Sequence, residues 1–126
     1  MTGGEKDLLA RSGTELDAAR LLAEGGFPAQ AVSRAYFGAF YAAEAALLEL
    51  GETRSRHSGV VAAFMQLVVA HGADPGAAKL LRSLFDRRGQ ADYSAQPVPP
   101  AEAGRAIDDA AAVVDAVRQW LADRPS

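Results

Sequence analysis

The amino-acid sequence predicts an all-α protein, a single domain of about five helices packed as an up-and-down bundle. Three observations predict this fold. Apolar residues recur with the period of a helix along most of the chain. No segment shows sustained alternation of β-branched residues, which a half-buried strand would show. The connections are short, and short connections make consecutive helices antiparallel. At 126 residues, the chain is expected to be one domain over 1–126.

The first helix is expected from about Gly4 to Glu24, because leucines and alanines there share one helical face. Ser12-Gly13-Thr14-Glu15 has the pattern of a capping box, so a helix starting at Ser12 is an alternative. One long helix, weakened at Gly13, is preferred because Leu8 and Leu9 continue the apolar face. The pair Gly25-Gly26 ends it.

The second helix, built around Val32–Leu48, is the one on which the rest of the chain is expected to pack. Two aromatic pairs at i, i+4 spacing give it a broad apolar surface, Tyr36 with Phe40 and Phe37 with Tyr41. A helix that is apolar over so wide an arc is usually central. Its one charged residue among these aromatics, Arg34, needs a partner from another helix, a second subunit or a ligand.

Three further helices complete the prediction. The third carries a nearly continuous apolar surface from Val60 and ends near Gly72. The fourth begins at Asp74-Pro75-Gly76, and a proline-rich linker follows it. The fifth begins at Pro100 and ends at Arg124-Pro125. Trp120 and the wide apolar arcs of the second and third helices exceed what one small bundle is expected to cover, which predicts a homodimer.

Composition excludes several classes of function. The chain has no cysteine and two histidines, so neither a thiolate nor a multi-histidine metal site is expected, and no cofactor is predicted. No apolar run reaches the length of about 18 residues that a membrane span needs. The first residues lack the apolar core of a secretory signal. We therefore expect a cytoplasmic protein that makes no contact with membranes.

Charge is distributed unevenly along the chain. The net charge is −3, but residues 53–91 contain six Lys or Arg and two Asp, which is +4, and leave −7 for the remainder. This basic middle is compatible with an anion or phosphate site. A solvated surface of mixed charge is the alternative.

Arg88 and Asp92 are the first candidate site residues. Arg88 follows Leu81 and Leu84 by seven and four residues, so it continues the buried face of the fourth helix, and Asp92 lies one turn further. One interpretation is an ion pair that fixes the helix end or a dimer interface. The other is an anion site in which Arg88 donates to phosphate oxygens while Asp92 orients it or accepts a proton.

His57 is the second candidate, at the expected start of the third helix beside Arg56 and Ser58. It is interpreted as a general acid or base, as a phosphate contact, or as a polar residue at a helix start with Ser55 or Ser58 as the cap. His71 is expected to be a residue of a helix C-terminus.

Three stretches together resemble the HEPN family, the higher eukaryotes and prokaryotes nucleotide-binding domain. Residues 31–48 are similar to the family helix A-x-N-R-A-Y-Y-A-x-F-x-A-A-x-A-L-L, with Ser33 for Asn and Phe37 for the second Tyr. Residues 56–60, RHSGV, resemble the K-x-H-S-G-V motif of a stand-alone prokaryotic branch. Residues 88–93, RGQADY, match the R-x-x-A-D-Y motif of that branch. The resemblance extends from about residue 7 to 121.

The resemblance implies a helical bundle that dimerises, and a metal-independent endoribonuclease of toxin–antitoxin or defence systems, paired with a nucleotidyltransferase antitoxin. Active members carry R-x(4–6)-H on the helix that corresponds to the fourth one here; Arg stabilises the phosphate and His assists attack by the ribose 2′-hydroxyl. No His follows Arg88 within six residues, and Asp92 stands near the vacant position. The antitoxin of some pairs adenylylates a tyrosine just past this motif, to which Tyr93 is the nearest match.

The site predicted from the sequence therefore has Arg88, Asp92 and His57 as candidate catalytic residues and Arg34, Arg56, Arg87 and Tyr93 as candidate substrate-binding residues. Two functions stay open. One is an RNA-cleaving or RNA-binding protein, the toxin half of a pair. The other is a catalytically inactive module that binds a nucleotide or a nucleotidyltransferase partner.

Overall fold

The computed structural model describes residues 1–125, which contain helices and no strand, so the predicted all-α class is confirmed. The elements in order are α1 (Gly3–Glu24), α2 (Pro28–Glu49), α3 (His57–Ala63), the π-helical turn η1 (Phe64–Val68), the 3₁₀ turn η2 (Val69–His71), α4 (Pro75–Tyr93) and α5 (Pro100–Asp123). The expected boundaries of the first, fourth and fifth helices agree with these to within a few residues.

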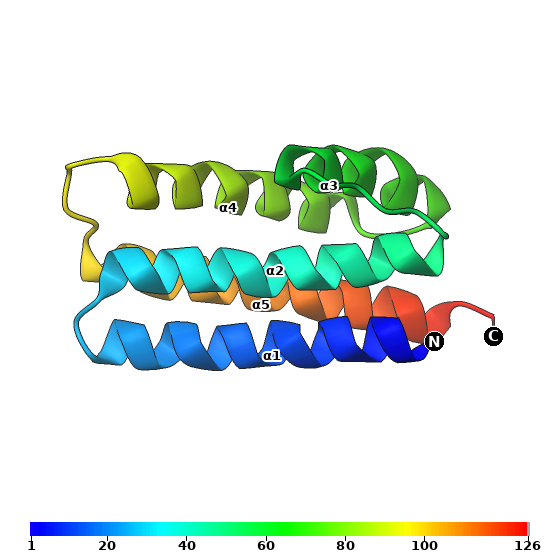
Figure 1. Cartoon of the computed structure of the whole chain (residues 1–126), viewed down its shortest axis with the longest axis horizontal. Coiled ribbons are helices and arrows are strands. Elements are labelled where there is room, and N and C mark those ends of the chain that lie inside the picture. The colour runs from blue at the N-terminus through cyan, green and yellow to red at the C-terminus, as the bar shows by residue number, and fades with distance from the viewer. Residues whose placement is uncertain (126) are drawn as a thin grey trace.

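Four long helices form the up-and-down bundle, and α2 is central to it (Figure 1). In Figure 1, α1 lies along one side of α2, α5 lies behind it, and α4 together with α3 forms the layer on its other side. After α2 the chain turns back along the bundle before α3 begins, so α3 is an addition beside α4 rather than a fifth full-length member. The basic segment of the sequence is this upper layer of α3 and α4.

The start of α1 corrects one alternative. Thr2 and Glu5 form the capping box, so the helix begins at Gly3, nine residues before Ser12. Ser12 lies inside the helix, is fully buried, and donates a hydrogen bond of 2.6 Å from its hydroxyl to the carbonyl oxygen of Gly38 on α2. The contact between the helices is close there, because a Cβ at Gly38 would lie 2.9 Å from Cδ2 of Leu16.

The core is built from α2 outward. Alanines at 35, 39, 42, 43, 45 and 46 are all fully buried, and their small side chains let the neighbouring helices approach. Trp120 is only 7% exposed and donates from Nε1 to the carbonyl oxygen of His71 at 2.9 Å. The expectation that one bundle leaves Trp120 uncovered is therefore wrong, because the short η2 turn covers it. Among residues 1–125, no helix is long and apolar enough to cross a membrane.

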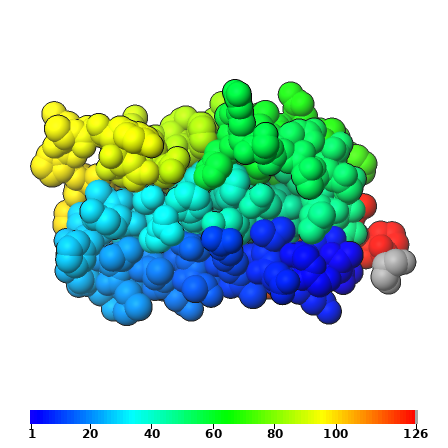
Figure 2. Space-filling model, in the orientation of Figure 1, coloured from blue at the N-terminus to red at the C-terminus, as the bar shows by residue number. Residues whose placement is uncertain are grey.

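Part of α2 remains open at the surface. Residues 34, 37, 41, 44 and 48 are half-buried and follow one another at alternating spacings of three and four, so they lie on one side of the helix. We call them the outer stripe of α2. Figure 2 shows α2 as a band that is visible between α1 and the layer of α3 and α4.

Candidate functional site

Phe37, on the outer stripe of α2, has three nitrogen-bearing side chains around its ring. The guanidinium carbon of Arg34 lies 4.6 Å from the ring centroid, and that of Arg88 on α4 lies 5.3 Å from it. The imidazole of His57 meets the ring edge-on at 5.6 Å between centroids. We call these residues, with Tyr36, the Phe37 cluster. They come from α2, α3 and α4, so the fold brings together residues that are up to 54 positions apart (88 − 34).

His57 is held by α2 on more than one side. Its ring stacks on Phe40 with 4.1 Å between centroids and an interplanar angle of 19°. Its Nδ1 lies 2.9 Å from the hydroxyl oxygen of Tyr36, which is fully buried. His57 begins α3 as expected, but the N-cap is Arg56 and no side chain caps it, so the expected serine cap is wrong.

The titration of this pair is shifted by burial. Burial lowers the pKa of His57, and the positive charge of Arg88 lowers it further. Burial also raises the pKa of Tyr36 far above its ordinary value, while Arg88 opposes that rise. At neutral pH the pair is therefore a neutral imidazole and a neutral phenol, beside a permanent positive charge.

Arg88 and Asp92 form the predicted ion pair at the end of α4. Nε of Arg88 lies 2.9 Å from Oδ2 of Asp92, and the two side chains are 24% and 28% exposed. The buried Nε nevertheless has no hydrogen-bond partner among residues 1–125, so its N–H is not directed at that oxygen. The pair is therefore close but badly aligned, and Arg88 retains donor capacity for another anion.

Arg34 has its partner on α1. Its Nη1 donates to Oε2 of Glu15 at 3.0 Å, so of the three expected sources of a partner it is another helix that supplies it. Arg34 and Asp92 line one shallow cavity of about 430 Å³, together with residues near the end of α1, the start of α2 and the end of α4. Arg34 therefore lies close enough to the end of α4 to add positive charge there.

Arg87 faces away from this cluster. It donates from Nε to Glu102 at 2.8 Å and from Nη1 to Asp109 at 2.9 Å, both on α5. Burial opposes the charge of Arg87, but the hydrogen bonds to Asp109 and Glu102 outweigh it and raise its pKa. Three acceptors, with Ser83, already occupy this guanidinium. The structure thus separates Arg87 from Arg88, although they are neighbours in the sequence.

The two remaining candidate residues, Arg56 and Tyr93, are exposed at the ends of helices. Arg56 is exposed at the start of α3, beside His57. Tyr93 is 82% exposed at the last residue of α4. His71 donates from Nδ1 to the carbonyl oxygen of Leu67 at 2.7 Å, as expected of a residue at a helix C-terminus.

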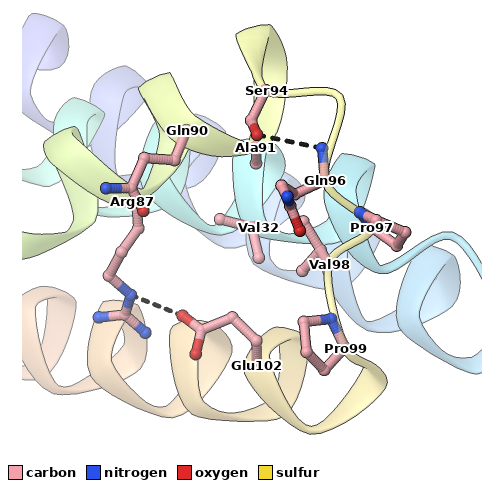
Figure 3. Close-up of a pocket in the computed structure, with 10 residues that line it drawn as sticks. All are labelled: Val32, Arg87, Gln90, Ala91, Ser94, Gln96, Pro97, Val98, Pro99 and Glu102. Carbon is pink, nitrogen blue, oxygen red and sulfur yellow. Dashed lines mark hydrogen bonds and ion pairs between the residues drawn. The ribbon is translucent and has the colours of Figure 1, made fainter.

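A second cavity lies where α4, the proline-rich linker and α5 meet (Figure 3). We call it the linker pocket; its volume is about 430 Å³. Figure 3 shows Val32 between two sides, with Arg87 and Gln90 on one and the linker residues on the other. Its lining residues are Val32, Arg87, Gln90, Ala91, Ser94, Gln96, Pro97, Val98, Pro99 and Glu102.

Two contacts of the site were not foreseen from the sequence, the hydrogen bond between Tyr36 and His57 and the ion pair between Arg34 and Glu15. Buried tyrosine hydroxyls need a partner, so Tyr36 was a signal that some polar side chain must reach α2. Glu15 lies on a face of α1 that also carries leucines, so its carboxylate too needs a partner from another helix. Among residues 1–125, no group of three or more acids and histidines could hold a metal ion.

Comparisons with known proteins find one matching family and several related sequences. The HEPN domain family matches residues 5–120. A UPF0332 protein of Gloeobacter violaceus is 38% identical over 86 residues, which is 68% of this chain and 67% of that protein. A UPF0332 protein of Thermotoga maritima is 38% identical over 62% of this chain and 60% of its own length. A Methanocaldococcus jannaschii protein named "Putative toxin MJ0605" is 30% identical over 84% of this chain and 80% of its own.

Proposed function

We propose an RNA-directed function from the premise that this chain belongs to the HEPN domain family. In this proposal it binds and cleaves RNA at the Phe37 cluster, as the toxin half of a toxin–antitoxin or defence pair. The relative that carries a toxin name supports the cellular context.

The observation that carries the proposal is the convergence of Arg88 and His57 on one ring. Arg88 and His57 lie 5.3 and 5.6 Å from Phe37, counting from the guanidinium carbon and from the imidazole centroid. The resemblance implies an arginine and a histidine as the working pair, and α4 lacks the histidine. His57 supplies an imidazole from α3 instead. A guanidinium beside an imidazole can hold a phosphate and assist proton movement at the ribose.

The cluster is balanced in charge, which limits how an anion can bind. Arg34 and Arg88 are each paired with a carboxylate, Glu15 and Asp92. The Arg34 pair is aligned as a hydrogen bond, and its Glu15 side chain is only 14% exposed. The Arg88 pair is not aligned. A phosphate therefore competes most easily with Asp92 for Arg88.

The first experiment measures binding and cleavage of single-stranded RNA and tRNA by purified protein. Arg88→Ala is expected to weaken binding and to reduce the slope of log affinity against log salt by about 1, the loss of one phosphate contact. Arg82→Ala is the matched control, an exposed arginine on the same helix. Equal RNA affinity and equal cleavage in the wild type, Arg88→Ala and Arg82→Ala proteins would refute the proposal.

Asp92→Asn separates two roles of the carboxylate. If Asp92 competes with RNA for Arg88, the substitution tightens binding by up to about fivefold, the range of one partly exposed ion pair. If Asp92 instead accepts a proton in cleavage, the cleavage rate falls while binding holds. Binding measured with an uncleavable 2′-deoxy oligonucleotide keeps the two readouts apart. A fall in affinity would contradict the competition between Asp92 and phosphate.

The linker pocket favours the alternative function, nucleotide binding. Its size is in the range of small-molecule sites, and its walls combine apolar faces with two glutamine amides, Gln90 and Gln96. Apolar faces suit the plane of a nucleobase, and amides suit its edge. Thermal shifts with ATP and GTP test this function, with Gln96→Ala as the variant expected to lose the shift. No shift with either nucleotide would count against it.

A second copy of the chain is the partner proposed for the outer stripe of α2. Half-buried residues at alternating spacings of three and four match the seam by which two helices pack. The stripe includes Phe37 and Tyr41, so a dimer would cover aromatic surface and bring two Phe37 clusters together. Sedimentation of wild type and Tyr41→Glu tests it; a wild-type protein that is monomeric at high concentration would refute it.

A nucleotidyltransferase is the second proposed partner, with Tyr93 as the residue it modifies. The phenol of Tyr93 is 82% exposed, so it is open to a modifying enzyme. Co-expression with a nucleotidyltransferase encoded beside this chain is expected to add one adenylate, and Tyr93→Phe to abolish it. Intact-mass measurement reads this directly. An unmodified chain, or modification that persists in Tyr93→Phe, would contradict the assignment.

A further inference from the structure

The hydroxyl of Tyr36 has very few hydrogen-bonding options. Tyr36 is 0% exposed, so water does not reach it, and aromatic rings of Phe37, Phe40 and Phe85 surround it. Among residues 1–125, Nδ1 of His57, at 2.9 Å, is the one hydrogen-bond partner of this oxygen. A buried O–H proton without an acceptor carries the full cost of its desolvation.

These facts decide the direction of the hydrogen bond. If Nδ1 carried the proton and donated to the Tyr36 oxygen, the phenolic proton would be left without an acceptor. If the phenol donates to Nδ1, both groups are satisfied, and the neutral imidazole carries its proton on Nε2. No residue among 1–125 bonds to Nε2, so that N–H remains available.

We propose that Tyr36 is a positioning residue that holds His57 in the Nε2-protonated tautomer, so that His57 presents a neutral N–H donor to a phosphate oxygen held by Arg88. The proposal rests on the proposed RNA site and assigns the chemical role of its imidazole. His57 is then a donor to the anion, and its Nδ1 is not available as a base.

The surroundings favour the neutral imidazole over imidazolium. Protonation of Nδ1 would leave the Tyr36 hydroxyl proton with no acceptor. Arg88 adds repulsion, and burial lowers the pKa of His57 in the same direction. Asp92 lies against Arg88 and offsets part of its charge. The charged and titratable groups near the pair are Arg34, Tyr36, Tyr41 and Glu44 on α2, Arg88 and Asp92 on α4, and Arg56 beside His57 on the chain.

Nitrogen-15 NMR of the imidazole in the free protein tests the tautomer without any RNA. We expect Nδ1 to have the shift of an unprotonated nitrogen and Nε2 that of a protonated one, across the neutral pH range. Tyr36→Phe is expected to give a mixture of tautomers and a higher pKa for His57, at unchanged helix content. Tyr41→Phe, which removes a hydroxyl from the same helix, is the control and keeps the single tautomer.

RNA binding tests the role of the donor. Binding of an uncleavable 2′-deoxy oligonucleotide is expected to be independent of pH between about 6.5 and 8, because a neutral donor does not titrate there. His57→Ala is expected to weaken binding by a factor of about 2 to 12, the range for one hydrogen bond. His57→Gln, which keeps an N–H donor, is expected to recover part of that loss.

The outcomes separate this inference from the proposed function. A protonated Nδ1 in the wild type overturns the inference, whatever happens with RNA. Wild-type affinity that falls as pH rises through this window, and does not do so in His57→Ala, also overturns it, because that is the behaviour of imidazolium. An Nε2 tautomer in a protein that binds no RNA refutes the proposed function and the phosphate contact, while the measured action of Tyr36 on His57 stands.

Discussion

Arg87 of α4 forms ion pairs with two carboxylates of α5. Its replacement by methionine tests how much these ion pairs contribute to the stability of the fold. The side chain leaves α4 and binds Glu102 and Asp109 on α5 at 2.8 and 2.9 Å. It is 21% exposed, and its partners are 26% and 34% exposed. Methionine keeps most of the buried stem, so Arg87→Met removes mainly the charge and its hydrogen bonds.

The magnitude follows from these two contacts. A hydrogen bond to a charged group contributes about 1.5–3 kcal/mol, and partial exposure places each of these near or below the lower end. Glu102 keeps a second partner, Arg105, at 3.1 Å, whereas Asp109 has no other hydrogen-bond or ion-pair partner among residues 1–125. We therefore expect Arg87→Met to lower the unfolding free energy by about 2–3 kcal/mol. For a chain of this size, this corresponds to a fall in Tm of roughly 6–15 °C.

The pH dependence gives the same test a second readout. Burial opposes the charge of Glu102, but hydrogen bonds from Arg87 and Arg105 outweigh it and lower its pKa. A carboxylate with a lowered pKa stabilises the fold above its ordinary pKa and loses that contribution as pH falls through the folded value. The difference in Tm between wild type and Arg87→Met is therefore largest at neutral pH and shrinks below about pH 4.5.

Calorimetry of the wild type, Arg87→Met and Arg82→Met decides the matter. Arg82 is exposed on the same helix, so its replacement is expected to change stability by less than about 0.5 kcal/mol. A fall in Tm for Arg87→Met no larger than that for Arg82→Met, or a difference that does not change with pH, would refute the reasoning. RNA affinity should survive in Arg87→Met, because this guanidinium faces α5 rather than the Phe37 cluster.

The other predictions concern the core and its titration. Gly38→Val is expected to cost about 1–3 kcal/mol by overpacking, since a Cβ there already meets a leucine of α1 at 2.9 Å, whereas Gly13→Ala, with nothing within 4 Å, is expected to stabilise by up to about 1 kcal/mol. Denaturant unfolding measures both, and equal effects would contradict the close contact of α1 with α2. Trp120→Phe is expected to cost about 1 kcal/mol by losing its hydrogen bond to the carbonyl of His71, and no loss would mean that this bond contributes nothing. Because the pKa of His57 is lowered, the unfolded chain binds more protons, so stability should fall as pH drops below about 6.5, and His57→Gln should flatten that fall.

Local patterns in the sequence were enough for the helices and for one ion pair. The pairing of Arg88 with Asp92 follows from i, i+4 spacing on a helix whose buried face was already visible from its leucines. The end of the first helix at the Gly25-Gly26 turn needed only the chemistry of a few neighbouring residues. Such features depend on contacts within one element, which a sequence shows directly.

The contacts between elements were not accessible in this way. Whether His57 reaches Tyr36 depends on where α3 begins after the loop of residues 50–56. This loop turns back along the bundle. The alignment of Arg34 with Glu15 depends on the rotation of α1 against α2, which the close contact at Gly38 sets. Neither the rotation of α1 against α2 nor the position at which α3 begins along the bundle produces a periodic pattern in the sequence.

Arg87 and Arg88 show why a run of basic residues does not by itself define an anion site. Adjacent residues on a helix point about 100° apart. That rotation places Arg87 against α5, where Glu102 and Asp109 accept its hydrogen bonds, and Ser83 of α4 accepts a third. It places Arg88 against the rings of Tyr36 and Phe37 on α2, and its carboxylate partner, Asp92 of α4 itself, is badly aligned. A guanidinium whose hydrogen bonds are satisfied within the protein, such as that of Arg87, stabilises the bundle. An unsatisfied donor beside a neutral imidazole, such as that of Arg88, can bind a phosphate. RNA binding is therefore expected to depend on Arg88, the arginine with the poorer partner within the protein.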